Sequence, residues 1–391
     1  MRGATFLQGI AFLFAAGIGC TPALPVSANL DETTALVAGI GLLPRSTTAS
    51  ATVITRVMVV LGNNTTTTNI YDPSTNMFSN GPTLTGSAAP GTIQFTIPSG
   101  THSGKTLIVH GASSSMYDPA TGSMVAGPAP SGTLGIGSAA FVVPAGGAQP
   151  GKVMIVHGGS LLTTSLYNPA THTMGAGAAL GFGPTGGSFT MYIPTGTQGG
   201  KFMTMQAGAQ RRAMFYDPVG DSYATSANQT TANVGGDAWA YLMTSGANPN
   251  KIFVVVANGA STTNLYDLAS DTWAASSPVL TAAASPGSNG FLVPSGGNSG
   301  KLLVLHGALT SSSFYDPSGN TMGGGPALTG NMGGGSCVFS ITAGPQMGKV
   351  MVVLGGNQTV TNIFDPSAST FSAGPSLTAN ANGGAQCFSI Q

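Results

Sequence analysis

One pattern occurs seven times in this chain and restricts its fold more than any other feature of the sequence. Each copy has a run of apolar residues, a loop rich in Ser or Thr, a corner in which Asp follows an aromatic residue, and a large side chain six positions later. Successive corners are 46, 50, 49, 50, 49 and 49 residues apart, and the corner residues are Asp72, Asp118, Asn168, Asp217, Asp267, Asp316 and Asp365. A constant period of this length indicates a repeat architecture.

Pro follows the corner residue in six of the seven copies. Its ring fixes φ at the second turn position, and the side chain of Asp or Asn caps backbone N–H groups two residues further on. Each corner is therefore predicted to be a tight turn between two strands.

Each copy is predicted to form four short strands. In the third copy these are residues 139–143, residues 153–156, a strand that ends at Tyr167 and a weaker strand around Met174. The second strand is apolar throughout, which is typical of a strand buried on both faces. Gly and Pro separate the segments, and no window has a helical period. We therefore predict an all-β fold, a seven-bladed β-propeller of four-stranded antiparallel blades.

The ends of the chain must close this ring. The first copy lacks an innermost strand, and two segments have the pattern of one: Leu36 to Leu43, and the C-terminal Gln386 to Ile390. The sequence of the second segment closely resembles that at 333–341. No second strand follows it with which it could pair. We predict that the C-terminal strand closes the ring, which leaves no open first blade.

The repeat resembles the kelch repeat, in which an apolar strand ends in Gly-Gly and is followed by a Tyr-Asp corner and then by Trp. Gly158-Gly159 and Gly355-Gly356 retain the glycine pair, and Trp273 retains the Trp. The resemblance covers roughly residues 50–391. Kelch propellers are mostly binding scaffolds, and a minority, similar to galactose oxidase, are copper enzymes.

The resemblance implies a binding, interaction or structural module with no enzymatic activity and no cofactor. One alternative is a copper-dependent oxidase similar to galactose oxidase, which would need two His and two Tyr at the copper and a Cys linked to one Tyr. The other is a surface adhesin that binds neutral glycans.

Three histidines share one repeat position at the end of the second strand, in copies two, three and six: His110, His157 and His306. Copies two and six lie on separate parts of a seven-fold ring, so the three cannot bind one ion. We interpret them as replacements of the first Gly of the pair. No Ser-His-Asp, paired-carboxylate or phosphate-loop pattern nominates catalytic residues.

A cation stands immediately before the second strand of every copy, and the set is Arg56, Lys105, Lys152, Lys201, Lys251, Lys301 and Lys349. This position lies beside the end of the third strand, where the corner residue stands, so Lys201 is expected to face Asp217. Only Lys152 faces an uncharged residue, Asn168. We interpret these sets as structural pairs that fix strand register, each contributing about 0–1 kcal/mol. The alternative is a charged ring that grips a ligand.

The opposite edge of the propeller carries loops with almost no charge, which can offer hydroxyl and amide hydrogen bonds. Because loops carry function disproportionately, this edge is the candidate binding face. Its candidate residues are Thr65, Thr66, Ser114, Thr163, Arg211, Arg212, Thr262, Ser312 and Gln358.

Composition restricts the partners. Charged residues make up only 6% of the chain and the formal net charge is zero. Nucleic acid and anionic membrane surfaces both require a basic footprint, so neither is expected. The expected partner is an unknown protein or a neutral glycan, and the chain is expected to be a monomer.

The N-terminus is predicted to be a targeting signal. Arg2 precedes an apolar segment at 6–16, and Cys20 closes a stretch that resembles a bacterial lipobox. We predict a signal peptide at 1–19, lipidation of Cys20, a tether at 20–50 and the propeller at 51–391. The alternative is ordinary cleavage after Ala28. The protein is expected in the bacterial cell envelope, as an outer-membrane lipoprotein or a periplasmic or cell-surface protein, with only the lipid touching the membrane.

Two further cysteines, Cys337 and Cys387, lie on innermost strands of neighbouring blades. They are offset by one residue relative to a shared Phe-Ser-Ile, so their side chains are expected to point to opposite faces of their sheets. We therefore expect two buried thiols and no disulfide.

Overall fold

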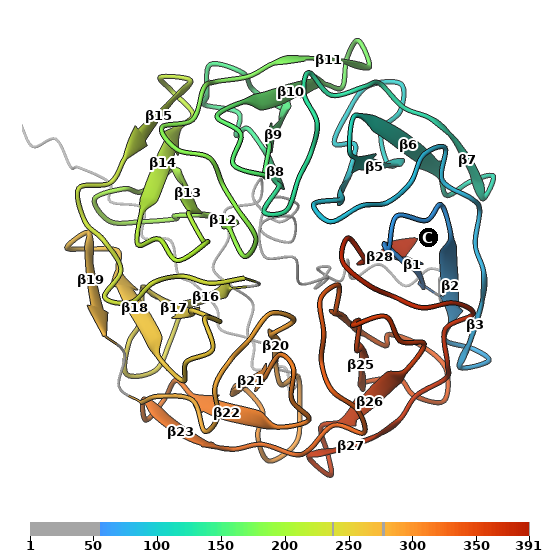
Figure 1. Ribbon diagram of the computed structural model, residues 1–391, viewed down its shortest axis with the longest axis vertical. Coiled ribbons are helices and arrows are strands. Elements are labelled where there is room, and N and C mark those ends of the chain that lie inside the picture. The colour runs from blue at the N-terminus through green and yellow to red at the C-terminus, as the bar shows by residue number, and fades with distance from the viewer. Residues whose placement is uncertain (1–54, 237, 276–277, 391) are drawn as a thin grey trace, which may run out of the picture.

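The computed structural model describes residues 55–236, 238–275 and 278–390 (Figure 1). Within these residues the chain forms seven four-stranded antiparallel sheets arranged around one axis, which confirms the predicted seven-bladed β-propeller. No helix in the described part of the chain is long and apolar enough to cross a membrane. The predicted signal peptide, Cys20, the tether and Leu36 to Leu43 lie outside the described residues.

Four strands make each blade, and we number blades by the order of their corners. The innermost strands are β28 (Gln386–Ile390), β4 (Ile93–Thr96), β8 (Ala139–Val142), β12 (Phe189–Tyr192), β16 (Trp239–Met243), β20 (Asn289–Leu292) and β24 (Cys337–Ser340). The second strands are β1 (Arg56–Val60), β5 (Thr106–His110), β9 (Val153–Val156), β13 (Phe202–Met205), β17 (Lys251–Val255), β21 (Leu302–Leu305) and β25 (Val350–Val353).

The third strands each end at a corner residue: β2 (Thr68–Asp72), β6 (Ser113–Asp118), β10 (Thr164–Asn168), β14 (Ala213–Asp217), β18 (Thr263–Asp267), β22 (Ser312–Asp316) and β26 (Thr361–Asp365). The outermost are β3 (Met77–Asn80), β7 (Ser123–Ala126), β11 (Thr173–Ala176), β15 (Ser222–Thr225), β19 (Thr272–Ala275), β23 (Thr321–Gly324) and β27 (Thr370–Ala373).

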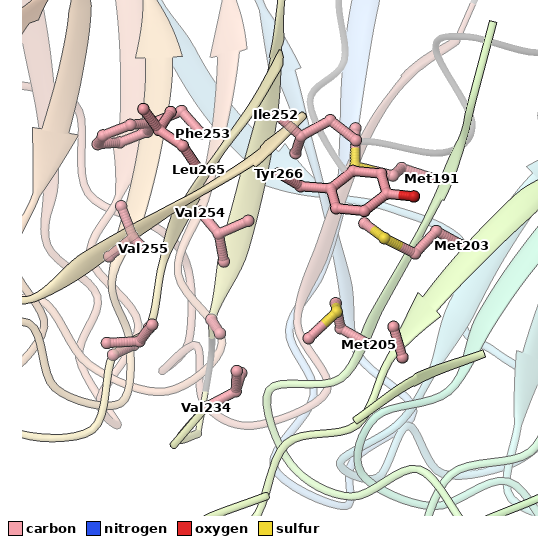
Figure 2. Close-up of a cluster of buried hydrophobic side chains, with 14 of the residues drawn as sticks. Met191, Met203, Met205, Val234, Ile252, Phe253, Val254, Val255, Leu265 and Tyr266 are labelled. Carbon is pink, nitrogen blue, oxygen red and sulfur yellow. The ribbon is translucent and has the colours of Figure 1, made fainter. Parts of the chain in front are cut away.

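The apolar core lies between neighbouring blades. The second strands are buried almost throughout, as their continuous apolar sequences predict. Figure 2 shows one cluster, in which Met203 and Met205 of blade four share a core with Ile252, Val254 and Tyr266 of blade five. The outermost strands β11, β15, β23 and β27 are largely exposed. Each blade is therefore held mainly by the sheets on either side of it.

The C-terminal strand closes the ring, as predicted. Strand β28 pairs with β1 in antiparallel register, with Cα partners that run from Arg56 opposite Ile390 to Val60 opposite Gln386. It thus supplies the innermost strand of the blade that begins the described chain. The first blade has no open inner edge.

The prediction of two free thiols is wrong, because Cys337 and Cys387 form a disulfide with Cα atoms 5.8 Å apart. Their side chains do lie on opposite faces of their own sheets, as the register predicted. In a ring of radial sheets, however, opposite faces of adjacent blades are the ones that meet. Val59, the cross-strand partner of Cys387, and Val353, the partner of Cys337, accordingly share one apolar cluster.

The propeller has two different faces. The corners and the loops that join first to second strands lie on one face, which we call the corner face. The loops that join second to third strands, and those that join one blade to the next, lie on the other, which we call the loop face. Both faces carry candidate residues.

Candidate functional site

All seven corners have the predicted capped turn. The Oδ1 atom of each corner residue accepts a hydrogen bond of 2.9–3.1 Å from the backbone N–H two residues later. Hydrogen bonds from the hydroxyl of Ser367 and from Lys349 hold the pKa of the Asp365 carboxyl well below its ordinary value. The Asp365 carboxylate therefore accepts hydrogen bonds from its own turn and also binds a cation.

Five blades contain the expected ion pair on the corner face. The N–O distances are 3.1 Å for Arg56–Asp72, 2.9 Å for Lys105–Asp118, 3.5 Å for Lys251–Asp267, 3.7 Å for Lys301–Asp316 and 3.0 Å for Lys349–Asp365. In each pair the cation precedes the second strand and the anion ends the third. These cations already have a carboxylate partner within their own blade.

The structure differs from the expectation at Lys201, which forms no ion pair with Asp217 among the described residues. Its Nζ donates to Gln198 Oε1 at 3.1 Å, and Gln198 Nε2 donates to Asp271 Oδ2 of the next blade at 2.8 Å. Because an aspartate of the next blade holds the amide nitrogen, the amide oxygen is left for the lysine. Lys152 is held in the same way, through Gln149 and Asp221.

The three histidines have structural partners at both ring nitrogens. The Nε2 atoms of His110, His157 and His306 lie 2.8–2.9 Å from the hydroxyls of Ser115, Ser165 and Ser313 in the adjacent strand. Their Nδ1 atoms lie 2.9–3.0 Å from a Ser or Thr hydroxyl in the following loop or strand. Each of the three inner serines also accepts a backbone N–H from the preceding blade. The histidine thus supports a hydrogen bond that joins two blades.

The remaining blades explain why histidine occurs where it does. In three of the other four blades the third strand has Asn in place of the serine, and the histidine position is apolar: Leu61 with Asn69, Val256 with Asn264, and Leu354 with Asn362. The side-chain oxygens of Asn69, Asn264 and Asn362 each accept the equivalent backbone N–H at 2.8 Å. The Asn carboxamide has both an acceptor oxygen and N–H donors. It can therefore accept this bond without a neighbouring imidazole to hold it in place.

These residues do not fit a copper site. Burial lowers the pKa of all three histidines, and lowers that of His306 to about 4, so the rings are neutral. Their nitrogens are nevertheless occupied by hydroxyls. Within the described ranges no group of three or more His, Cys, Asp or Glu side chains is placed to hold a metal ion.

Two candidate residues of the loop face point into the fold. Ser114 and Ser312 are buried, and their hydroxyls donate to the backbone oxygens of Pro128 and Pro326. They fasten the outermost strand of their blade and are not part of a surface.

The other candidates do lie in loops of the loop face. Four are bonded within them: Thr65 to Gly62, Thr163 to His157, Gln358 to Gly355 and Asn331, and Arg211 to Asn233. The side chains of Thr66, Thr262 and Arg212 have no hydrogen-bond partner among the described residues. Some candidate side chains of the loop face therefore form hydrogen bonds within their own loops, and others are left for a ligand.

A cluster of four asparagines lies on this face where blade seven meets blade one. Asn63 and Asn380 donate to Asn357 Oδ1 at 3.3 and 3.4 Å, and Asn382 donates to Asn63 Oδ1 at 3.3 Å. Asn63, Asn357 and Asn380 are exposed. No charged residue occurs in the loops that carry the cluster, at 61–68, 354–361 and 376–386.

The backbone holds this asparagine cluster in place. Asn63 and Asn357 have φ of 59° and 63°, a left-handed conformation that Asn tolerates better than most residues. The N–H groups of Asn63, Asn357 and Asn382 donate to Gly383, Ala381 and Leu61 at 2.8–3.0 Å. The amides are therefore presented from ordered loops.

Three of the candidate residues predicted from the sequence, Thr65, Thr66 and Gln358, lie in the loops that carry the cluster, but none of the four asparagines was predicted. Asn63 and Asn382 are 319 residues apart in the chain and come together only because the ring closes. The available signal was a Gly-Asn sequence after the second strand in the first and last copies.

No family model matches the chain, and no curated protein matches it. Among solved structures, the chain is similar to a fungal alcohol oxidase of the AA5 family in complex with copper. The TM-score is 0.54 at 15% sequence identity, and the match covers 83% of this chain and 71% of that chain. At this identity the likeness shows a shared fold.

This match corrects one expectation from the sequence. We expected a chain without enzymatic activity, but a solved structure that shares its fold is that of an enzyme. The non-enzymatic expectation is therefore withdrawn. The copper chemistry of that protein is not carried over, because a likeness at 15% sequence identity shows the fold alone.

Proposed function

We propose that this chain is an exported, kelch-like β-propeller that binds an uncharged, hydroxyl-rich ligand, such as a neutral glycan, on its loop face. The asparagine cluster of Asn63, Asn357, Asn380 and Asn382 is the observation that supports this proposal. It gathers four carboxamides on one uncharged and ordered part of the surface.

The chemistry of carboxamides suits such a ligand. Each Asn side chain has two N–H donors and one oxygen that can accept twice, so it can bond to neighbouring hydroxyl groups. The contacts between the four amides are 3.3–3.4 Å long, near the limit for a hydrogen bond. A ligand hydroxyl can replace these contacts at little cost.

Two observations support export. The first is the sequence of the N-terminus, in which Arg2 precedes an apolar segment at 6–16 and Cys20 follows, as in a targeting signal. The second is the Cys337–Cys387 disulfide, since disulfides persist mainly in oxidising compartments outside the cytosol. A Cys20→Ser variant that still partitions into detergent would contradict the lipid anchor and leave export intact.

The ligand class can be tested by applying the purified full-length chain to an array of neutral and acidic glycans. We expect binding to neutral glycans that persists at high salt, because no charge is involved. Binding confined to acidic glycans and lost at high salt would contradict the proposal.

A further inference from the structure

Blade six has a pocket at its outer edge, on the side of the corner face. The pocket has a volume of about 310 Å³ and lies beside β23, the outermost strand of this blade (Figure 1). Its lining consists of Asn298, Lys301, Phe314 and Asp316, together with residues 321–324 of β23. We call it the blade-six pocket. Ligand pockets in proteins span about 300–1,000 Å³, so this one suits a single small ring.

The pocket is open because β23 has no side chains beside an aromatic residue of the neighbouring strand. Phe314 of β22 stands directly opposite Gly323, and Gly324 follows. Directly opposite residues of an antiparallel pair lie on the same face of the sheet, so a side chain at position 323 would lie beside the Phe314 ring. A Cβ built on either glycine meets nothing within 4 Å. The half-buried Phe314 side chain therefore forms an apolar wall of the pocket.

Among the seven described blades, only blade six combines an aromatic residue with a glycine at these two positions. In blade four Phe215 stands opposite Ala224 and is buried, and in blade three Leu166 stands opposite Gly175. The remaining pairs are Ile70–Ser79, Met116–Val125, Leu265–Ala274 and Ile363–Ser372. The aromatic wall is thus a feature of blade six and not of the repeat.

The polar side of the pocket also differs from the equivalent place in blades three and four. In those blades a Gln three residues before the lysine accepts from its Nζ, as Gln198 does from Lys201 at 3.1 Å. Blade six has Asn298 at that position, which is one methylene shorter, and its Nδ2 donates to Ser369 Oγ of blade seven at 2.8 Å. Asn298 Oδ1 accepts no hydrogen bond within the described part of the chain. It is therefore left for a ligand.

The ion pair at the pocket is the longest of the five. Lys301 Nζ lies 3.7 Å from Asp316 Oδ2, compared with 2.9–3.5 Å in the other four pairs, which is beyond hydrogen-bond distance. Ser318 donates to Asp316 Oδ1 through both its hydroxyl and its backbone N–H, and these bonds hold the pKa of the Asp316 carboxyl below its ordinary value. The pocket therefore offers one ammonium donor and two oxygen acceptors beside an apolar wall.

We infer that the blade-six pocket binds one pyranose ring of an uncharged saccharide. The C–H face of such a ring can pack against Phe314, while its hydroxyls both donate and accept. A hydroxyl can accept from Lys301 Nζ and donate to Asp316 Oδ2 or Asn298 Oδ1. One cation and one anion line the pocket, so its lining has no net charge that would favour an ionic ligand.

This inference does not rest on the asparagine cluster. The cluster lies on the loop face where blade seven meets blade one, and the pocket lies at the outer edge of blade six on the side of the corner face. A ligand bound in the pocket would therefore contact none of the four asparagines, and the two sites can be tested separately.

Saturation-transfer NMR of the full-length chain tests the inference, with methyl glucoside, methyl mannoside and methyl galactoside as uncharged probes and methyl glucuronoside as an anionic one. The measurement is made in an Asn63→Gly/Asn357→Gly background, so that signal from the asparagine cluster does not contribute. We expect at least one uncharged probe to give a signal in this background. Adding Gly323→Val should abolish the signal, because the new side chain fills the space beside Phe314.

Gly175→Val is the matched control. Gly175 occupies the same position in blade three, and a Cβ there also meets nothing within 4 Å, so both variants are expected to fold. The control should keep the signal. Asn298→Gln/Ser369→Asp copies the arrangement of Gln198 and Asp271 in blade four, which gives Lys301 an amide partner, and should weaken the signal.

Three results would overturn the inference. One is the absence of signal from every uncharged probe in the Asn63→Gly/Asn357→Gly background. Another is a signal confined to methyl glucuronoside, which would show an ionic ligand. The third is an equal effect of Gly323→Val and Gly175→Val, whether the signal persists in both or is lost in both. None of these results bears on the loop face, because the background lacks two amides of the asparagine cluster.

Discussion

Cys337 and Cys387 join the innermost strands of the last and first blades, β24 and β28, by a disulfide between residues that are 50 positions apart in the chain. The strand that closes the ring is thus held by backbone pairing to β1 on one side and by a covalent bond to the neighbouring blade on the other. Ring closure is the point at which this fold has been reinforced most strongly.

Removing the disulfide should lower the free energy of unfolding. For a loop of this length we expect a loss of about 2–4 kcal/mol in a Cys337→Ala/Cys387→Ala variant. Urea unfolding of the oxidised wild type, the reduced wild type and the variant measures it. Identical midpoints for the oxidised and reduced wild type would show that the bridge does not stabilise the ring.

Deleting residues 386–391 should destabilise the whole domain and not only blade one. The deletion exposes the inner edge of β1. It also exposes the apolar surface that Phe388 and Ile390 now cover. Because it also removes Cys387, the proper control is the full-length Cys337→Ala/Cys387→Ala variant. A cooperative thermal transition at the same temperature in both proteins would contradict the role of β28.

Two corner aspartates allow the contribution of the ion pair to stability to be separated from that of the turn-capping hydrogen bond. Asp365 caps its turn and pairs with Lys349 at 3.0 Å, whereas Asp217 caps its turn without an ion pair among the described residues. Asp365→Asn should therefore cost at most about 1 kcal/mol and Asp217→Asn close to nothing. Asp365→Ala should cost roughly 1–2 kcal/mol, because the cap is lost as well. Equal losses for Asp365→Asn and Asp217→Asn in thermal melts would contradict the pairing.

Because three histidines are buried, we expect the free energy of unfolding to fall at acidic pH. Burial lowers the pKa of His306 from 6.5 to about 4. Between these values the unfolded chain binds a proton that the folded chain does not, so stability falls as pH drops from about 6.5 to about 4. Above pH 6.5 this histidine contributes no pH dependence.

The chain itself supplies the variant that tests this. His306→Leu/Ser313→Asn copies the pair found at Leu354 and Asn362 and keeps an acceptor for the backbone N–H of the preceding blade. Its melting temperature should fall less than that of the wild type between pH 7 and pH 4. An unchanged pH dependence would contradict a contribution of His306 to the acid sensitivity.

The sequence was sufficient for the architecture because each blade repeats the same local signals. The continuous apolar second strands and the Asp-Pro corners each determine a short segment, and seven copies determine the ring. The C-terminal strand could be assigned because its sequence resembles that of the innermost strand at 333–341.

Contacts between blades could not be predicted in the same way. The disulfide was missed because strand register gives the face of one sheet and does not give the face that its neighbour presents. Lys201 was assigned to Asp217 because Asp271, which directs Gln198 toward it, belongs to the next blade. The asparagine cluster combines loops from the two ends of the repeat series.

Calorimetric titration of a neutral glycan identified on the array, into three single variants, tests the central claim most directly. Asn357→Gly and Asn63→Gly remove an amide while keeping a residue that tolerates positive φ, and Asn250→Gly makes the same change at φ 58° on the corner face. We predict about tenfold weaker binding for each of the first two, equivalent to one net hydrogen bond of about 1.4 kcal/mol, and wild-type affinity for Asn250→Gly. Wild-type affinity in all three variants would contradict the assignment of the site.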